Sequence, residues 1–271
     1  MKRIYILAGL AAAMLLLAAC NNSAQPTATP GVGGAVAIAE VYCSTSNETA
    51  KAAYNEALAL EEQGNLAEAE RLYRQAIELD AGYCDAMDNL GLLLRQQGKV
   101  EEAISWYQQS LLLMPDNSVA LLNLATSYHI QGDVDQAEAT FEKLIEVAPD
   151  NPEGYFGLGS IFISLQQYGQ AVPYLEKAEQ LYGEVNSPWI LDAQYLLCSA
   201  HFMLQDYPTA KAYAEAIYDH YDEDGPINYI LGMGYLMEAS PDMKTAREYI
   251  LKAQELGVDV PDEVLTAIEG D

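Results

Sequence analysis

The chain has 271 residues, with 40 acidic and 13 basic side chains, which gives a formal net charge of −27 at pH 7. Such an acidic surface repels phosphate backbones and anionic headgroups, so the composition argues against nucleic acid as a partner. The charge is compatible with a basic protein partner, and equally with acidic residues that only keep an exported protein soluble.

The first twenty residues have the layout of an export signal. Lys2 and Arg3 precede an apolar run over residues 4–19, which ends in LAAC at Cys20. This ending resembles the bacterial lipoprotein signal, which implies removal of residues 1–19 and attachment of lipid to Cys20. Several acyl chains, at about 0.8 kcal/mol per buried methylene, hold a protein to a bilayer almost permanently. The alternative is an uncleaved signal anchor.

Residues 20–45 are predicted to form the lipidated cysteine and a flexible tether. The stretch from Asn21 to Gly34 carries no charge and is rich in Pro, Thr, Ser and Gly. It cannot bury a core and therefore reads as a linker. The lipid would place the protein in the cell envelope, facing outside the cytoplasm, with the choice of inner or outer membrane left open.

A period of 34 residues begins near Ala50. Small residues recur at this interval in two series: Ala57, Gly91, Ala125 and Gly159, and Ala69, Ala103, Ala137 and Ala171. A third series, Gly64, Gly98 and Gly132, falls where a helix has to stop and turn. Self-similarity at this period predicts stacked pairs of antiparallel helices. The small residues are needed where two helices cross closely.

The second and third units show the pattern most clearly. Their matching positions are Met87, Leu90, Gly91, Leu94, Ala103, Tyr107 and Pro115, and Leu121, Leu124, Ala125, Tyr128, Ala137, Phe141 and Pro149. These residues resemble the tetratricopeptide repeat (TPR) at the family spacing. The resemblance implies an all-α, right-handed solenoid that binds other proteins.

Six repeats are expected within a solenoid over residues 46–257: 50–83, 84–117, 118–151, 152–185, 191–224 and 225–260. In the first, helices should run to about Glu62 and from Leu66 to Leu79, with Ser46 or Thr49 as possible caps. The fourth has Gln166 where earlier repeats have glycine.

The interval then breaks. Five residues are inserted before Cys198, where Ser187 and Pro188 predict the start of a longer helix. The sixth repeat has two extra loop residues that bring in Ser240 and Pro241, another predicted helix start. Residues 261–271 are expected to form a capping helix and tail, with Val264, Leu265 and Ile268 on one face.

The cysteines and histidines suggest a disulfide more than a metal site. Cys43 precedes the first helix and Cys84 begins the next equivalent helix, so an exported protein could pair them or leave both free. Cys198 and His201 occupy the small and aromatic positions of a repeat, so packing explains both and no metal is expected. The carboxylates between Asp219 and Asp224 do not fit a calcium loop and are interpreted as a solvated turn.

No cofactor or catalytic site is indicated, because no nucleophile and base stand outside the repeat register. The TPR resemblance instead implies a concave surface lined by positions two, five, nine, twelve and thirteen of each repeat. In the first two repeats these positions are mixed and polar. In the later repeats they become apolar, and the predicted partner-binding groove consists of Leu122, Thr126, Ile130, Phe156, Ser160, Ile163, Tyr195, Ser199, Phe202, Met203, Tyr229, Met233 and Met237.

Two interpretations of these apolar residues remain open. They form a groove for a peptide or helix, or they pack on one another. The first leads to a non-catalytic, membrane-tethered scaffold for protein–protein interaction. The alternatives are an assembly factor or pilotin-like lipoprotein for an envelope machine, and a carrier of a small hydrophobic ligand.

Overall fold

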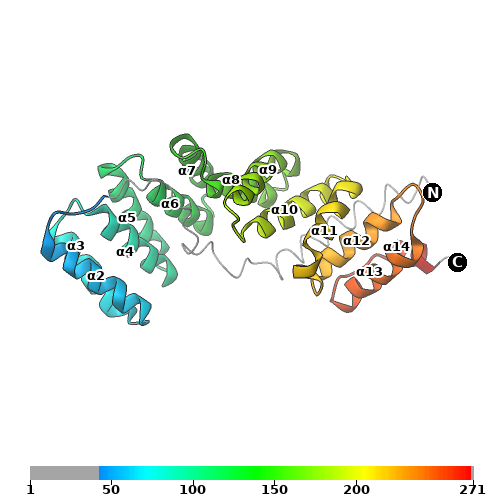
Figure 1. The fold of residues 1–271 in the computed structure, drawn as a ribbon, viewed down its shortest axis with the longest axis horizontal. Coiled ribbons are helices and arrows are strands. Elements are labelled where there is room, and N and C mark those ends of the chain that lie inside the picture. The colour runs from blue at the N-terminus through cyan, green and yellow to red at the C-terminus, as the bar shows by residue number, and fades with distance from the viewer. Residues whose placement is uncertain (1–42, 270–271) are drawn as a thin grey trace. The chain divides into compact units, whose positions relative to one another are not determined.

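The structure, a computed structural model, describes residues 43–269, which form 13 α-helices and no strands. The helices are α2 (Glu48–Glu62), α3 (Leu66–Leu79), α4 (Cys84–Gln96), α5 (Val100–Leu113), α6 (Ser118–Gln131), α7 (Val134–Val147), α8 (Pro152–Ser164), α9 (Tyr168–Glu184), α10 (Ile190–Met203), α11 (Tyr207–Tyr221), α12 (Gly225–Leu236), α13 (Met243–Glu255) and α14 (Asp262–Glu269) (Figure 1). The predicted signal, Cys20 and most of the tether lie outside the described residues.

The described residues fall into two compact units, residues 43–161 and residues 162–269. In the first unit, α2 packs with α3, α4 with α5, and α6 with α7, as expected for helix-turn-helix repeats. The second helix of each pair also contacts the first helix of the next pair, and α4 contacts α6 directly. This arrangement is the all-α solenoid that the 34-residue period predicts.

The second unit continues the pattern with α9 to α14. Each helix packs against the next, and α10 also contacts α12. One apolar cluster runs through α10 to α14, and α14 closes it by burying Val264 and Ile268. This position agrees with the expected capping helix.

Glycine allows the helices of a pair to approach closely. A Cβ atom on Gly91 would lie 2.6 Å from the ring of Tyr107, and one on Gly232 would lie 2.5 Å from the side chain of Ile250. Tyr107 and Ile250 are both fully buried. The prediction that small residues mark helix crossings is confirmed at these two positions.

The turns inside the first three repeats need a left-handed backbone. Gly64, Gly98 and Gly132 have φ angles of 77°, 78° and 82°, a region that glycine enters without steric cost. Gln166 and Gln205 take the equivalent place in the fourth and fifth repeats, with φ of 60° and 63°. The turn geometry is therefore kept where the glycine is lost.

Three predicted helix starts need correction. The cap of α2 is Asn47, whose side chain accepts hydrogen bonds from two backbone amides, so neither Ser46 nor Thr49 caps this helix. Ser187 and Pro188 precede α10 in the connecting turn, and the insertion is divided between this turn and the last residues of α9, the longest described helix at 17 residues. The cap of α13 is Asp242, which follows Ser240 and Pro241 and accepts a hydrogen bond from the Thr245 amide. Asn47 and Asp242 directly precede their helices, where a side-chain oxygen reaches the free amides of the first turn, whereas Ser46 and Ser240 lie further out.

No helix within residues 43–269 combines the length and the apolar composition needed to cross a membrane.

Candidate interaction surface

The predicted surface residues lie along the first helix of each pair, and we call them the first-helix stripe. In the first unit, the stripe residues on α2, α4 and α6 include apolar side chains that are partly open to solvent. Leu58, Leu92 and Leu122 are half-buried, while Val119 and Ile130 are 45% and 46% exposed. Phe156 and Ser160 on α8 are half-buried. These side chains are within reach of a partner.

The hydroxyl groups of the stripe are bonded within their own helices. Thr126 donates to the carbonyl oxygen of Leu122 at 2.8 Å, and Ser160 donates to that of Phe156 at 2.8 Å. In the second unit, Ser199 donates to the carbonyl oxygen of Tyr195 at 3.1 Å. Because each hydroxyl hydrogen is already used, half-buried Thr126 and Ser160 offer a partner only methyl or methylene groups and acceptor lone pairs.

The structure separates the predicted groove residues of the second unit into two groups. Ile163, Met203 and Met237 are half-buried. Five residues are buried instead: Tyr195, Ser199, Phe202, Tyr229 and Met233. The open-groove interpretation therefore does not describe these five in this structure, and packing on the same chain does.

Aromatic contacts account for the burial of Tyr195, Phe202 and Tyr229. The ring of Tyr195 lies 5.2 Å from that of Tyr221, and the ring of Phe202 lies 5.5 Å from Tyr207 and 5.8 Å from Tyr229. Tyr207 and Tyr221 come from α11, the second helix of the same repeat. Edge-to-face and tilted ring pairs at these distances are favourable beyond their buried area.

A buried polar joint, which the repeat spacing does not predict, links α4 and α6. The side-chain amide of Asn117 donates to Asp88 Oδ2 at 2.7 Å and to Ser110 Oγ at 3.2 Å, and Arg95 donates to Asn123 Oδ1 at 3.1 Å. Asp88 and Arg95 occupy stripe positions, yet they are only 5% and 9% exposed. Burial raises the pKa of Asp88 to about 7, against hydrogen bonds that lower it.

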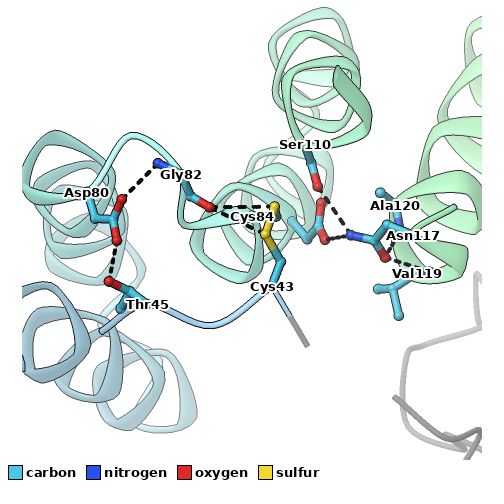
Figure 2. Close-up of a disulfide and its surroundings, with 10 residues drawn as sticks. Cys43, Thr45, Asp80, Gly82, Cys84, Ser110, Asn117, Val119 and Ala120 are labelled. Carbon is cyan, nitrogen blue, oxygen red and sulfur yellow. Dashed lines mark hydrogen bonds between the residues drawn. A yellow bond between two sulfur atoms is a disulfide. The ribbon is translucent and has the colours of Figure 1, made fainter. Parts of the chain in front are cut away.

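Cys43 and Cys84 are joined by a disulfide, with 5.2 Å between their Cα atoms. This distance lies within the usual range for the bond. Figure 2 shows the pair beside Gly82, with Thr45 reaching Asp80 in the turn before α4. The segment before the first helix is thus attached to the start of the second repeat.

The other candidate sites are occupied by packing and capping contacts. The buried thiol of Cys198 donates to the carbonyl oxygen of Ala210, and His201 Nδ1 lies 3.1 Å from Asp206 Oδ2. In the acidic turn, Asp224 accepts a hydrogen bond from the Ile227 amide as the cap of α12. Residues 43–269 contain no cluster of histidine, cysteine and carboxylate side chains suited to a metal ion.

Sequence comparison finds profiles described as "Tetratricopeptide repeat" at residues 50–83, 82–150 and 116–184. No curated protein matches the sequence significantly.

Solved structures with the same arrangement include three proteins. YrrB, titled a TPR protein with an unusual peptide-binding site, is 21% identical, with a TM-score of 0.60 over 73% of this chain and 98% of its own. PilF of Pseudomonas aeruginosa is 18% identical, with a TM-score of 0.65 over 81% of this chain and 96% of its own. MamA is 23% identical, with a TM-score of 0.53 over 62% of this chain and 94% of its own. At these identities the likeness concerns the fold alone.

Proposed function

We propose a specific binding role for this chain, which belongs to the tetratricopeptide-repeat family and has the fold of a protein–protein interaction scaffold. In this proposal, the first-helix stripe of the first unit receives an extended or helical segment of a partner protein. The chain itself acts without catalysis, and its N-terminal lipid holds it to a membrane outside the cytoplasm.

The observation that carries the proposal is the uneven burial of the stripe. On consecutive first helices of the first unit, Leu58 and Leu92, each at the ninth position of its repeat, keep part of their surface in contact with water, as does Leu122 at the fifth position of the third repeat. At the corresponding ninth position of the fifth and sixth repeats, Ser199 and Met233 are buried in their own unit. Half-exposed leucines on the stripe of three successive first helices suit an apolar ligand that crosses several repeats.

The charge of the first unit supports a basic, apolar partner segment. Residues 43–161 contain 20 acidic and six basic side chains. Of the basic ones, Arg71, Arg74, Lys99 and Lys143 form ion pairs within the unit, and Arg95 is buried. A partner therefore approaches a surface with a large excess of carboxylates, which favours lysine and arginine on the partner's polar side.

Site-specific photo-crosslinking in the native cell tests the binding proposal. A photoreactive residue at Leu122 should capture one main partner, whereas the same residue at Leu112, which is 82% exposed at the end of α5 and outside the stripe, should not. The replacements Leu92→Glu and Leu122→Glu together should abolish that capture by a probe at Val119, while Leu112→Glu should leave it intact. Equal capture from Leu112 and Leu122 would contradict the proposal.

The intact mass of the detergent-extracted protein tests the tether separately. We expect a chain that begins at Cys20 and carries the added mass of acyl groups. The Cys20→Ser variant should remain uncleaved and without lipid. A mature chain of unmodified mass, extracted without detergent, would remove the membrane part of the proposal and leave the binding part standing.

A further inference from the structure

A short segment before α2 holds three helix ends together. Residues 43–47 form this segment, which we call the clasp, and its outer end is Cys43, bonded to Cys84 at the start of α4. Thr45 donates a hydrogen bond to Asp80, in the turn after α3, and accepts one from the Asn47 amide at 2.9 Å. The clasp therefore links the first repeat to the beginning of the second (Figure 2).

Asn47 completes the clasp at its inner end. Its side-chain oxygen accepts hydrogen bonds from the amides of Thr49 and Ala50, at 3.0 and 3.2 Å, and so caps α2. Its side-chain nitrogen donates to the carbonyl oxygen of Leu79, at 2.9 Å, the last residue of α3. One side chain thus joins the N-terminus of α2 to the C-terminus of α3.

Asp80 gives the clasp a fixed partner in the turn. Its second carboxylate oxygen accepts a hydrogen bond from the Gly82 amide at 2.9 Å, so the turn holds the carboxylate that Thr45 reaches. The hydrogen bond from Thr45, with that from Gly82, lowers the pKa of Asp80. The carboxylate stays charged, and these contacts remain favourable, over the whole physiological pH range.

The helix that the clasp holds has a weak apolar anchor of its own. The buried residues of α2 are three alanines, Ala50, Ala53 and Ala57, whereas α4 buries several large aliphatic side chains. Tyr54, Leu58 and Leu60 of α2 also pack on the core but stay half-buried. Because burial energy scales with the apolar area removed from water, α2 is anchored less firmly than α4. Elements with few buried contacts open locally before better-buried elements do.

We propose that the Cys43–Cys84 disulfide is a redox-sensitive clamp on the first repeat, and that its reduction releases α2 while the following repeats stay folded. The bond closes a loop between residues 41 apart in the sequence, which contains the whole of α2 and α3. The proposal is independent of what the first-helix stripe binds. Its consequence is that α2, which carries Tyr54 and Leu58, has an open and a closed state.

The reductant is a dithiol, and it enters from the side of Cys43. Cys43 is half-buried, whereas Cys84 is fully buried. A dithiol thiolate attacks the sulfur of Cys43 and displaces the sulfur of Cys84, which takes up a proton. The second thiol of the reductant then forms its internal disulfide and releases Cys43 as a thiol. Two electrons and two protons pass to the two cysteines.

Hydrogen exchange followed by mass spectrometry, on the full-length protein with and without dithiothreitol, tests the clamp. Thiol alkylation and peptide mapping establish that Cys43 and Cys84 are paired before treatment and free after it. The amides of α2 should then exchange about tenfold faster or more, while those of α4 to α7 keep their rates. Reoxidation should restore slow exchange in α2.

Two variants make the result specific. Cys43→Ser should behave like the reduced protein without any reductant, because it removes the half-buried partner and leaves buried Cys84 in place. Cys198→Ala removes the remaining described thiol and should respond to dithiothreitol like the wild type. Unchanged exchange of α2 after proven reduction would overturn the clamp, as would equal acceleration from α2 through α7 or a peptide map without the Cys43–Cys84 link.

Discussion

Asn117 ties two helices together through opposite ends of its side chain. Its nitrogen donates to Asp88 of α4 at 2.7 Å, while its oxygen accepts from the amides of Val119 and Ala120, at 3.1 and 3.2 Å, and caps α6. The protonation state of Asp88 therefore acts on the contact between neighbouring repeats and on a helix cap together.

This joint predicts that the first unit becomes more stable as the pH falls. Burial first, and the nearby charge of Asp85, raise the pKa of Asp88 to about 7 from an ordinary value of 3.8. Between these values the folded state binds a proton that the unfolded state lacks, so the free energy of unfolding falls as the pH rises. We expect a difference on the order of 3 kcal/mol between pH 5 and pH 8 from this group.

Urea unfolding of the first unit at several pH values measures this effect. The two tryptophans of the chain, Trp106 and Trp189, lie in different units, so a Trp189→Phe background makes fluorescence report on the first unit. Asp88→Asn should flatten the slope with pH and raise stability at pH 8. Asp116→Asn, in an exposed loop, should leave the slope as it is; an unchanged slope in Asp88→Asn would refute the assignment.

Gly91→Ala should destabilise the first unit by up to about 2 kcal/mol. Alanine is better than glycine inside a helix by about 1 kcal/mol, but here its Cβ would meet the stiff, buried ring of Tyr107 at 2.6 Å. Overpacking of this kind costs about 1–3 kcal/mol, so the clash outweighs the helix gain.

Gly169→Ala is the matched control, because an added Cβ on this α9 residue meets nothing within 4 Å. It should stabilise the second unit by up to about 1 kcal/mol. Denaturation followed by Trp106 for the first variant and by Trp189 for the second measures both. A stabilising Gly91→Ala would mean that the two helices of this repeat can move apart freely.

Gln166→Gly should stabilise the second unit by about 0.5–1 kcal/mol. Gln166 has φ of 60°, where a side chain is strained and glycine is not, and this gain exceeds the extra freedom of glycine in the unfolded chain. The same change at Gln180, an exposed residue inside α9, should cost about 1 kcal/mol. Thermal unfolding followed by Trp189 should therefore move in opposite directions, and a loss of stability in both would be evidence against strain at Gln166.

Val264→Ala combined with Ile268→Ala should loosen α14 and cost the second unit about 2–4 kcal/mol. Both side chains are at least 95% buried in the cluster that α14 closes, and their removal leaves a cavity or detaches the helix. Hydrogen exchange in α13 should rise with that of α14, while the first unit is unaffected. Thr266→Ala, on the exposed side of α14, should change neither.

The sequence predicted the structure best at positions where the local backbone geometry accepts only glycine or another small residue. The period of small residues and turn glycines predicts the helix pairs, and the bounds Glu62, Leu66 and Leu79 agree with the structure. Close helix crossings require small residues and left-handed turns favour glycine. The interval between such residues is therefore enough to predict these positions.

The stripe was harder to predict because its burial depends on residues outside the repeat pattern. Tyr195 and Phe202 are covered by Tyr221 and Tyr207, which stand at positions that the repeat does not specify. The repeat spacing predicts that Asp88 faces solvent. In the structure its carboxylate is buried and accepts a hydrogen bond from Asn117, the cap of α6. Interactions between elements far apart in sequence set both outcomes.

The disulfide also makes the covalent structure of recombinant protein depend on the compartment in which the protein is produced. Recombinant material made in a bacterial cytosol, where thiols are kept reduced, would carry Cys43 and Cys84 unlinked. Its α2 would be held by hydrogen bonds, three buried alanines and the half-buried side chains of Tyr54, Leu58 and Leu60. Material secreted into the periplasm would carry the covalent link. Affinities measured on the two preparations would belong to chemically different proteins, above all for ligands that touch α2.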